Sequence, residues 1–210
     1  MKLTSADDLR TMYRHPKGGP VDKVIHTLDE HCLDFLAKSP FFVLSTADKN
    51  GICDGSPKGG PPGFVEALDR GRLAWADFSG NNRLDSFENL VTNASVALLF
   101  MIPGLDETFR VNGRAELTTD EALCERFAVR GKAAKVVVVV TVEEAYLHCA
   151  KALRRGGLWD ADSWLPVAER PSGAAIVRDH AAIDADLAAV EAFRDQNLVE
   201  TLWEPGGERT

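Results

Sequence analysis

The strict alternation of residue types between positions 108 and 117 is the feature that most constrains how this chain can fold. Small or apolar residues alternate there with polar ones: Phe109, Val111, Gly113, Ala115 and Leu117 against Thr108, Arg110, Asn112, Arg114 and Glu116. Successive side chains of a β-strand point to opposite faces, so this segment predicts a strand with one face in a core and one polar face. Half-buried strands of this kind are typical of antiparallel sheets.

Four other segments also have the composition of short strands. Residues 41–46 and 96–101 are apolar runs, residues 64–77 predict a strand pair that turns at 69–71, and residues 135–142 include five consecutive valines. About six strands without a regular alternation of strand and helix predict a mainly β fold with helices, of the α+β class. We therefore expect an antiparallel barrel with helices at its rim.

Helices are expected at both ends of the chain. Residues 5–39 predict helices broken at 15–20 by prolines and glycines, and residues 183–202 predict an amphipathic C-terminal helix. A further helix is expected to begin at Asn81 or Asn82, because an asparagine side chain can cap free backbone N–H groups. Residues 143–155 are predicted to be helical or mixed. Residues 54–63 hold four glycines and three prolines and predict a functional loop.

Charge and cysteine usage exclude several classes of protein. The 210 residues carry a formal net charge of −8, which argues against a nucleic-acid binder that works by broad phosphate neutralisation. No stretch approaches the roughly 20 apolar residues that cross a bilayer, and the chain begins without an apolar signal core. The four cysteines lie far apart in sequence, so we expect reduced thiols and a cytoplasmic protein.

Motifs for catalysis or metal binding are scarce. The sequence contains no glycine-rich nucleotide loop, no H-E-x-x-H and no G-x-S-x-G elbow. His26 and His31 are five positions apart, which does not align them on one helical face, so we expect no metal site. Cys149 beside His148 is interpreted as a structural cysteine rather than a nucleophile. The sequence therefore shows no catalytic machinery of its own.

Two segments have the residue types that an anion needs. The first combines Ser56 and Lys58 with glycines, including Gly59, that let a ligand approach the backbone. The second, residues 80–86, places Arg83 and Ser86 on the first turn of a helix, where free N–H groups and the helix dipole favour an anion. Taken alone, the first segment also fits a Gly/Pro turn, and the second also fits an ordinary capped helix. Together on a small barrel they favour a phosphate site.

The order of these blocks resembles the pyridoxamine 5′-phosphate oxidase-like split barrels that bind FMN, and in particular a bacterial subgroup of FMN-dependent enzymes. The resemblance runs over roughly residues 24–165, and its blocks lie at 39–42, 56–59, 62–65, 80–86, 107–115, 148–152 and 158–159. It implies a split barrel over residues 40–165, a helical N-terminal segment at 1–39 and a helical tail at 166–210 that packs on the same domain.

The resemblance also implies a bound FMN and a homodimer with the flavin at the subunit interface. The residues at the matching positions are Ser56, Lys58, Gly59, Asn81, Asn82, Arg83, Ser86, Thr108, Arg110, Cys149 and Lys151. Of these, Cys149 and Lys151 are expected to act from the second subunit. Subgroup members often have arginine where this chain has Lys58, which keeps the charge but gives up bidentate geometry.

The activity implied is that of a flavin-dependent oxidoreductase acting on a small substrate, with a nicotinamide or another electron donor. His148 and Arg110 are the candidate acid or base groups. True pyridoxamine phosphate oxidation is not expected, because residues 198–205 read LVETLWEP where the true oxidases have an Arg-Leu-His-Asp run. The alternatives are a non-catalytic flavin carrier or sensor, a barrel that binds haem or the deazaflavin F420, and an empty dimeric interaction module.

Overall fold

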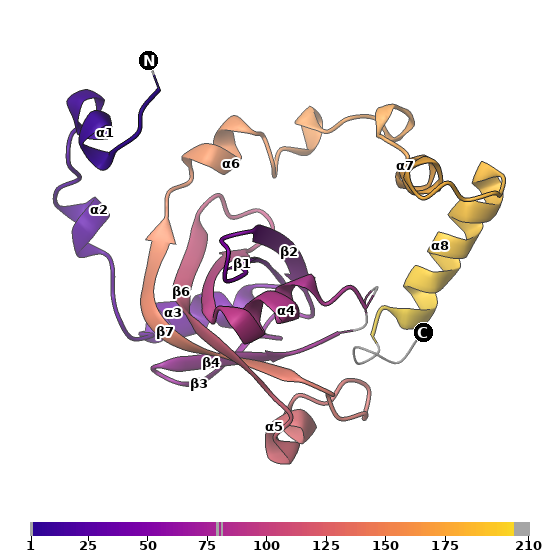
Figure 1. Cartoon of the computed structure of the whole chain (residues 1–210), viewed down its shortest axis with the longest axis horizontal. Coiled ribbons are helices and arrows are strands. Elements are labelled where there is room, and N and C mark those ends of the chain that lie inside the picture. The colour runs from indigo at the N-terminus through magenta and orange to yellow at the C-terminus, as the bar shows by residue number, and fades with distance from the viewer. Residues whose placement is uncertain (1, 79, 81, 204–210) are drawn as a thin grey trace.

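The structure is a computed structural model that describes residues 2–78, 80 and 82–203. One antiparallel sheet rolls around a core, and the helices lie outside it (Figure 1). The strands are β1 (Phe41–Ala47), β2 (Cys53–Gly59), β3 (Glu66–Asp69), β4 (Arg72–Ala76), β5 (Ser95–Met101), β6 (Thr108–Thr118) and β7 (Val137–His148). The helices are α1 (Ala6–Met12), α2 (Gly19–Asp22), α3 (Glu30–Lys38), α4 (Asp85–Thr92), α5 (Glu121–Arg126), α6 (Lys151–Arg155), α7 (Gly173–His180) and α8 (Leu187–Thr201).

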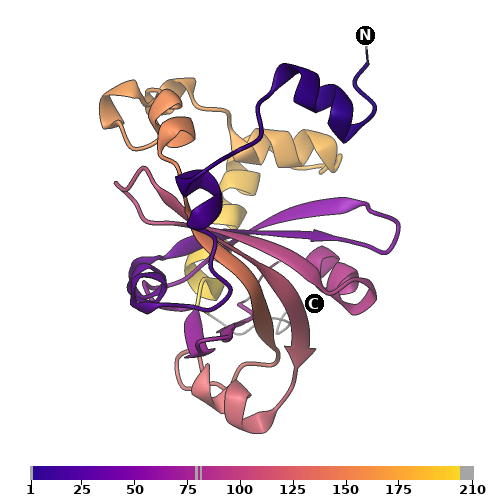
Figure 2. The same cartoon turned by 90° about the vertical axis from the view of Figure 1, so that its left-hand side faces the viewer.

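The strand order explains why the sheet rolls up without closing. The order is β2-β1-β5-β6-β7-β4-β3, and each pair of neighbours is antiparallel. The long strands β6 and β7 pair from Thr108 opposite His148 to Thr118 opposite Val137, and they bend strongly in side view (Figure 2). The edge strands β2 and β3 do not pair with each other. This is the split barrel that the sequence predicts, with seven strands in place of about six.

A bulge in β7 bends the sheet near its middle: Glu143 is the extra residue between Glu144, which pairs with Asn112 of β6, and Val142, which pairs with Gly113. A side chain at Gly113 would collide with the carbonyl oxygen of Thr141 on β7, so this position requires glycine. The bulge thus depends on one residue of the alternating segment.

The core fills the inside of the rolled sheet. Phe42 on β1 contacts Trp75 on β4 and Phe100 on β5, with ring centroids 5.0 and 4.9 Å apart. Helix α3 covers this cluster with Cys32, Phe35 and Leu36. A second, smaller cluster lies beneath α5 and includes Cys124, Phe127 and Val139. Burial of these aromatic and aliphatic side chains is the main stabilising contribution to the fold.

Several predicted elements need correction. Residues 53–59 form the edge strand β2 rather than part of a loop, and Pro57 is tolerated there because an edge strand has one unpaired side. Residues 143–148 continue β7 and only residues 151–155 are helical, because the pairing with β6 extends to His148. The C-terminal helix begins later than expected, at Leu187, where Asp186 caps it. Helix α7 lies within the tail that is expected to be helical, and Ser172 caps it. The predicted strands at 41–46, 64–77, 96–101 and 108–117 are confirmed.

None of the helices in the described part of the chain combines the length and apolarity needed to cross a membrane.

Candidate functional site

A cavity of about 720 Å³ lies between β2, the end of β4 and the start of α4. Both segments that the sequence predicts as anion sites line it, with Ser56, Lys58 and Gly59 on one side and Asn82, Arg83 and Ser86 on the other. The structure therefore brings together two short segments that have β3 and β4 between them in the sequence.

Strand β2 aims its polar side chains at this cavity because of its register with β1. Ser56 lies opposite Leu44 and Lys58 opposite Phe42, so these two polar side chains share the core-facing side of the sheet. Residues 54, 56 and 58 are half-buried, whereas residues 55, 57 and 59, which alternate with them, are exposed. At this edge the apolar core gives way to the cavity, which allows polar side chains to face inward.

The start of α4 differs from the prediction. The helix begins at Asp85, and its N-cap is Leu84, which makes no side-chain capping bond. The predicted cap Asn82 instead adopts a left-handed conformation with φ of 57°, and Leu84 does so with φ of 56°. The other predicted cap, Asn81, lies outside the described residues. Left-handed backbone is uncommon for residues other than glycine and clusters at functional sites.

The first turn of α4 offers backbone donors to the cavity. The first bond within the helix runs from the N–H of Glu88 to the carbonyl of Leu84, at 2.9 Å. The amides before Glu88 therefore have no acceptor inside the helix. Asp85, Ser86 and Phe87, which carry these amides, line the cavity, and the helix dipole adds a partial positive charge there.

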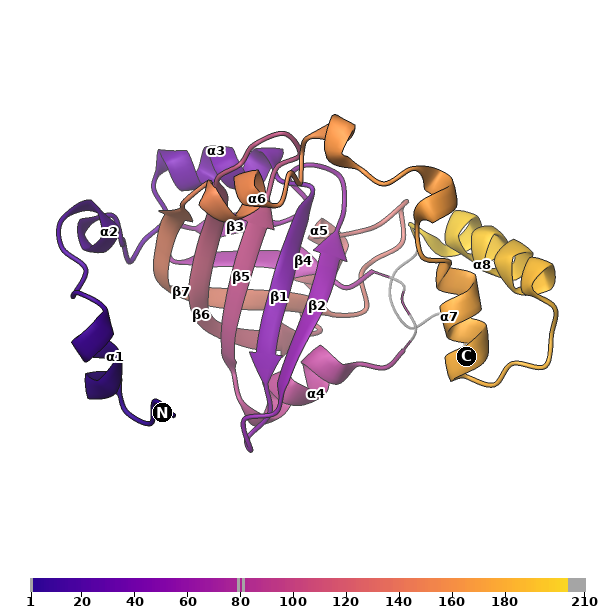
Figure 3. The same cartoon turned by 90° about the horizontal axis from the view of Figure 1, so that it is seen from above.

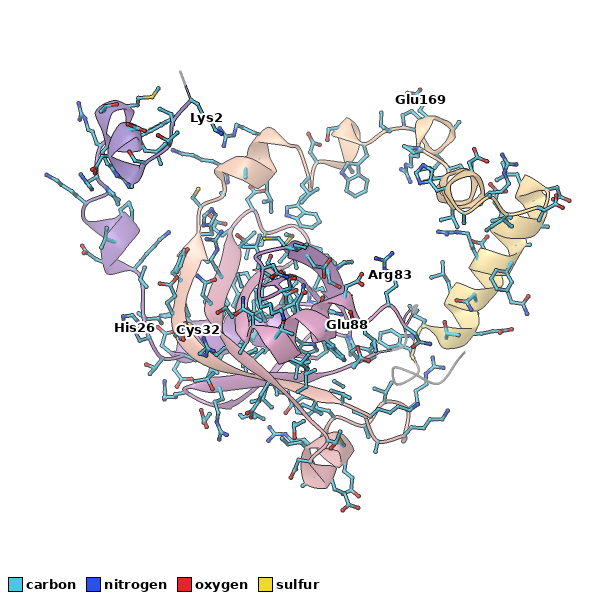
Figure 4. The ribbon with its side chains drawn as sticks, in the orientation of Figure 1. Lys2, His26, Cys32, Arg83, Glu88 and Glu169 are labelled. Carbon is cyan, nitrogen blue, oxygen red and sulfur yellow. The ribbon has the colours of Figure 1, made fainter. Side chains whose placement is uncertain are left out.

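Carboxylates hold the basic and hydroxyl groups of the cavity in place. Arg83 Nε donates to Asp85 Oδ2 at 2.9 Å, and Ser86 Oγ donates to Asp54 Oδ2 at 2.8 Å. Lys58 Nζ lies 6.0 Å from the centre of the Phe87 ring. Arg83 is 72% exposed, and Figure 4 shows it on the side of the barrel that faces α8. An anion entering the cavity can therefore reach this guanidinium, in competition with Asp85.

Asp77 is a cavity residue that the sequence reasoning missed. It follows β4 directly and is the first polar residue after a buried strand, which is the signal that could have identified it. Burial raises the pKa of the Asp77 carboxyl, and the positive charge of Lys58 opposes that effect more weakly. The cavity thus contains a carboxyl group that retains its proton more readily than usual.

Aromatic side chains form another wall of the cavity, and the sequence reasoning missed them as well. Phe64, Trp75, Phe78 and Trp203 all line it. A second cavity of about 450 Å³, beneath the loop at 61–64 and beside α5, shares Phe64, Phe78 and Trp203 with the first. The two cavities are therefore separated by aromatic rings.

The remaining predicted site residues lie away from the cavity within one chain. Thr108 is buried at the start of β6, and Arg110 lies on the outer face of the same strand. Cys149 and Lys151 are exposed in the segment after β7. One chain does not bring these four residues to the cavity, so their contact with a cofactor stays a prediction for an assembled dimer.

The candidate acid or base groups form a cluster on the outer face of β6 and β7. Arg110 Nη1 donates to the hydroxyl of Tyr146 at 3.0 Å, and the guanidinium lies 5.6 Å from the centre of that ring. Burial lowers the pKa of His148, and the positive charges of Arg110 and Lys23 lower it further. The imidazole of His148 therefore holds a proton less readily than an ordinary histidine.

The chain is thus a split-barrel protein of the α+β class that presents basic side chains, helix N–H groups and aromatic rings to one cavity. A family model described as pyridoxamine 5′-phosphate oxidase matches residues 28–149, and the chain belongs to this family. The match includes β1 to β7 and the segments around the cavity except for Leu202 and Trp203.

Solved structures with a similar fold include HupZ of Group A Streptococcus, which is 19% identical, with a TM-score of 0.46 over 57% of this chain and 93% of that one. A protein of Lactobacillus delbrueckii assigned to the pyridoxamine 5′-phosphate oxidases is 22% identical, with a TM-score of 0.45 over 58% and 95%. An FMN-binding protein of Syntrophomonas wolfei is 14% identical, with a TM-score of 0.44 over 58% and 88%. At these identities the likeness concerns the fold alone. A comparison with curated proteins gave no match.

Proposed function

We propose that the protein binds FMN in the 720 Å³ cavity and acts as a cytoplasmic FMN-dependent oxidoreductase on a small substrate. The observation that carries the proposal is the convergence of β2 and the start of α4 on one cavity. A phosphate needs positive charge, hydroxyl donors and backbone N–H groups, and these two segments supply all three. The family membership supports the proposal, because flavin is the usual cofactor of this family.

The residues present fit FMN in both charge and size. Lys58, Arg83 and Ser86 would hold the phosphate, with the first-turn amides of α4. Phe64, Phe78 and Trp203 would contact the ring system. The cavity volume is within the roughly 300–1,000 Å³ of typical cofactor sites. Bound FMN would supply hydride or electron transfer, while the protein positions the ring and sets the polarity around it.

The proposed assembly is a homodimer formed by the outer face of the sheet. Figure 3 shows β2, β1, β5, β6 and β7 side by side across the front, with α3 and β4 behind them. On this outer face Phe41, Val43 and Leu99 are only half-buried. Asn112 lies on the same face, and its Oδ1 is buried without a hydrogen-bond partner among the described residues. A second chain on this face would supply a hydrogen-bond donor to Asn112 Oδ1 and would cover the apolar side chains.

The first experiment is a visible absorption spectrum of the freshly purified protein, followed by mass analysis of the compound that heat releases. Two flavin bands and the mass of FMN are the expected result. An excess of NADH or NADPH oxidation over a flavin-free control would then support turnover. A colourless protein that also takes up no added FMN would contradict the proposal.

A non-catalytic flavin carrier is the second candidate. It is favoured by the position of His148 and Arg110, which lie on the outer face of the sheet rather than in the cavity. The same position of His148 disfavours haem in the cavity, because histidine is a common axial ligand of haem iron and this one lies elsewhere. F420 would be distinguished from FMN by the mass of the released compound. Flavin binding without nicotinamide oxidation would favour the carrier.

A further inference from the structure

The C-terminal helix α8 reaches the barrel at the candidate FMN cavity. It packs against α7, and Phe193 and Val199 are 70% and 80% exposed. The two residues that follow the helix, Leu202 and Trp203, line the cavity. In Figure 1 this end of α8 lies beside the segment that leads into α4.

Trp203 joins the aromatic wall of the cavity from outside the barrel. Its ring lies 6.3 Å from that of Phe78 at an angle of 82°, an edge-to-face contact. Phe78 in turn lies 6.1 Å from Phe64, whose side chain is buried. Trp203 is therefore fixed from one side by a chain of rings that leads back to the core. Its indole is still half-buried, so part of it remains available to a ligand.

We infer that Trp203 is a positioning residue that contacts the ring system of a planar, phosphate-bearing ligand and thereby docks α8 on the barrel. This inference rests on the proposed function, because it takes the phosphate of that ligand to be held by Lys58 and Arg83. With the phosphate at the start of α4, the aromatic wall is the part of the cavity suited to a planar ring. The ligand class is a planar heteroaromatic phosphate, of which FMN is the probe.

The contact couples ligand binding to the position of α8. A ligand that packs on Trp203 favours the docked helix, and the docked helix must favour the ligand by the same factor. The family match ends at residue 149, so this helix is a feature of this chain outside the matched segment. Binding of the flavin would then change the position of α8, which is exposed at the surface of the molecule.

The test compares the wild-type protein with Trp203→Ala, Trp203→Phe and a control, Trp164→Ala. Trp164 is exposed and does not line the cavity. Two quantities are measured on the full chain: the Kd for FMN, from quenching of flavin fluorescence, and deuterium uptake by peptides covering residues 187–203 with and without FMN. Circular dichroism confirms that each variant is folded.

Trp203→Ala is expected to raise the Kd about 3- to 10-fold, the range typical of one aromatic contact. FMN should slow deuterium uptake in α8 of the wild type and of Trp203→Phe, but not of Trp203→Ala. Trp164→Ala should behave like the wild type. An unchanged Kd in Trp203→Ala, or equal protection of α8 in that variant, would overturn the inference while leaving the FMN site intact. Failure of the wild type to bind FMN would overturn the proposed function and this inference together.

Discussion

At the scale of a single residue, the substitution of Arg83 tests the proposed phosphate site. Replacing it with alanine removes a charge-assisted hydrogen bond, which is worth about 1.5–3 kcal/mol. We expect Arg83→Ala to raise the Kd for FMN roughly 10- to 150-fold. Because the side chain is exposed, the free energy of unfolding of the apoprotein should change little. Arg10→Ala, which changes an exposed arginine of α1 outside the cavity, is the control in the same fluorescence titration. Equal Kd values for the two variants would contradict the assignment.

The raised pKa of Asp77 predicts how the stability of the fold depends on pH. Its pKa is raised in the folded state by burial, so the folded protein binds this proton more tightly than the unfolded chain. Stability contributed by this group is therefore lost as pH rises from the ordinary pKa of an aspartate through the raised one. Asp77→Asn should increase the free energy of unfolding at pH 7 relative to the wild type, and the difference should shrink in acid.

Asp48 provides a control of opposite sign for Asp77. Backbone N–H groups of Ile52 and Asn50 lower the pKa of Asp48, so its contribution is present above the ordinary pKa and is lost as pH falls through the lowered one. Asp48→Asn should therefore reduce stability at pH 7. Urea unfolding at a series of pH values measures both effects. If both variants changed the free energy of unfolding in the same direction at pH 7, burial would not be the dominant effect on the pKa of Asp77.

At the scale of elements, the place where Gly113 of β6 faces the bulge in β7 is sensitive to substitution. Gly113→Ala forces a methyl group against the carbonyl of Thr141 and should cost more than about 3 kcal/mol. Gly55→Ala in β2 meets open space and is the matched control, with a change of about 0.5 kcal/mol at most. Thermal unfolding of both variants checks the prediction. Equal melting temperatures would mean that the strand can shift without cost.

The elements differ in how far the sequence predicts them. The alternation in β6 identifies a half-buried strand directly, because one face packs on the core and the other does not. The residues of β2 predict a loop, since its glycines and Pro57 are poor strand formers. Their extended conformation comes from pairing with β1, which is a tertiary effect. The predicted start of α4 is too early for a related reason: left-handed backbone at Asn82 and Leu84 is not visible in residue preferences.

At the scale of the whole molecule, residue types identified the anion-binding part of the site but not the rest. Ser56, Lys58, Arg83 and Ser86 are recognisable because they lie in short segments suited to phosphate. Trp203 enters the cavity only through the packing of α8, which no local pattern encodes, and Asp77 is marked in the sequence only as the first polar residue after β4. The same distinction applies to Arg110 and Lys151, whose proposed contact with FMN depends on a second chain.

The dimer proposed for the outer face of the sheet can be tested by a charge placed at its centre. Val43 lies on β1 opposite Leu99 of β5, and both side chains are half-buried on that face. A carboxylate there would lose its hydration against a second apolar face, which is unfavourable without a partner. Val43→Glu should therefore convert a two-chain assembly into single chains, as measured by light scattering after gel filtration.

The same variant links assembly to the site. If Arg110 and Lys151 reach FMN from the second chain, the monomeric Val43→Glu variant should bind FMN more weakly than the wild type. Val91→Glu, an exposed position on α4 away from this face, should leave both the mass and the Kd unchanged. A wild-type protein that is monomeric would contradict the proposed dimer. A monomeric Val43→Glu variant with an unaltered Kd would show instead that one chain supplies every contact with the cofactor, in which case the cavity between β2 and α4 is the complete site.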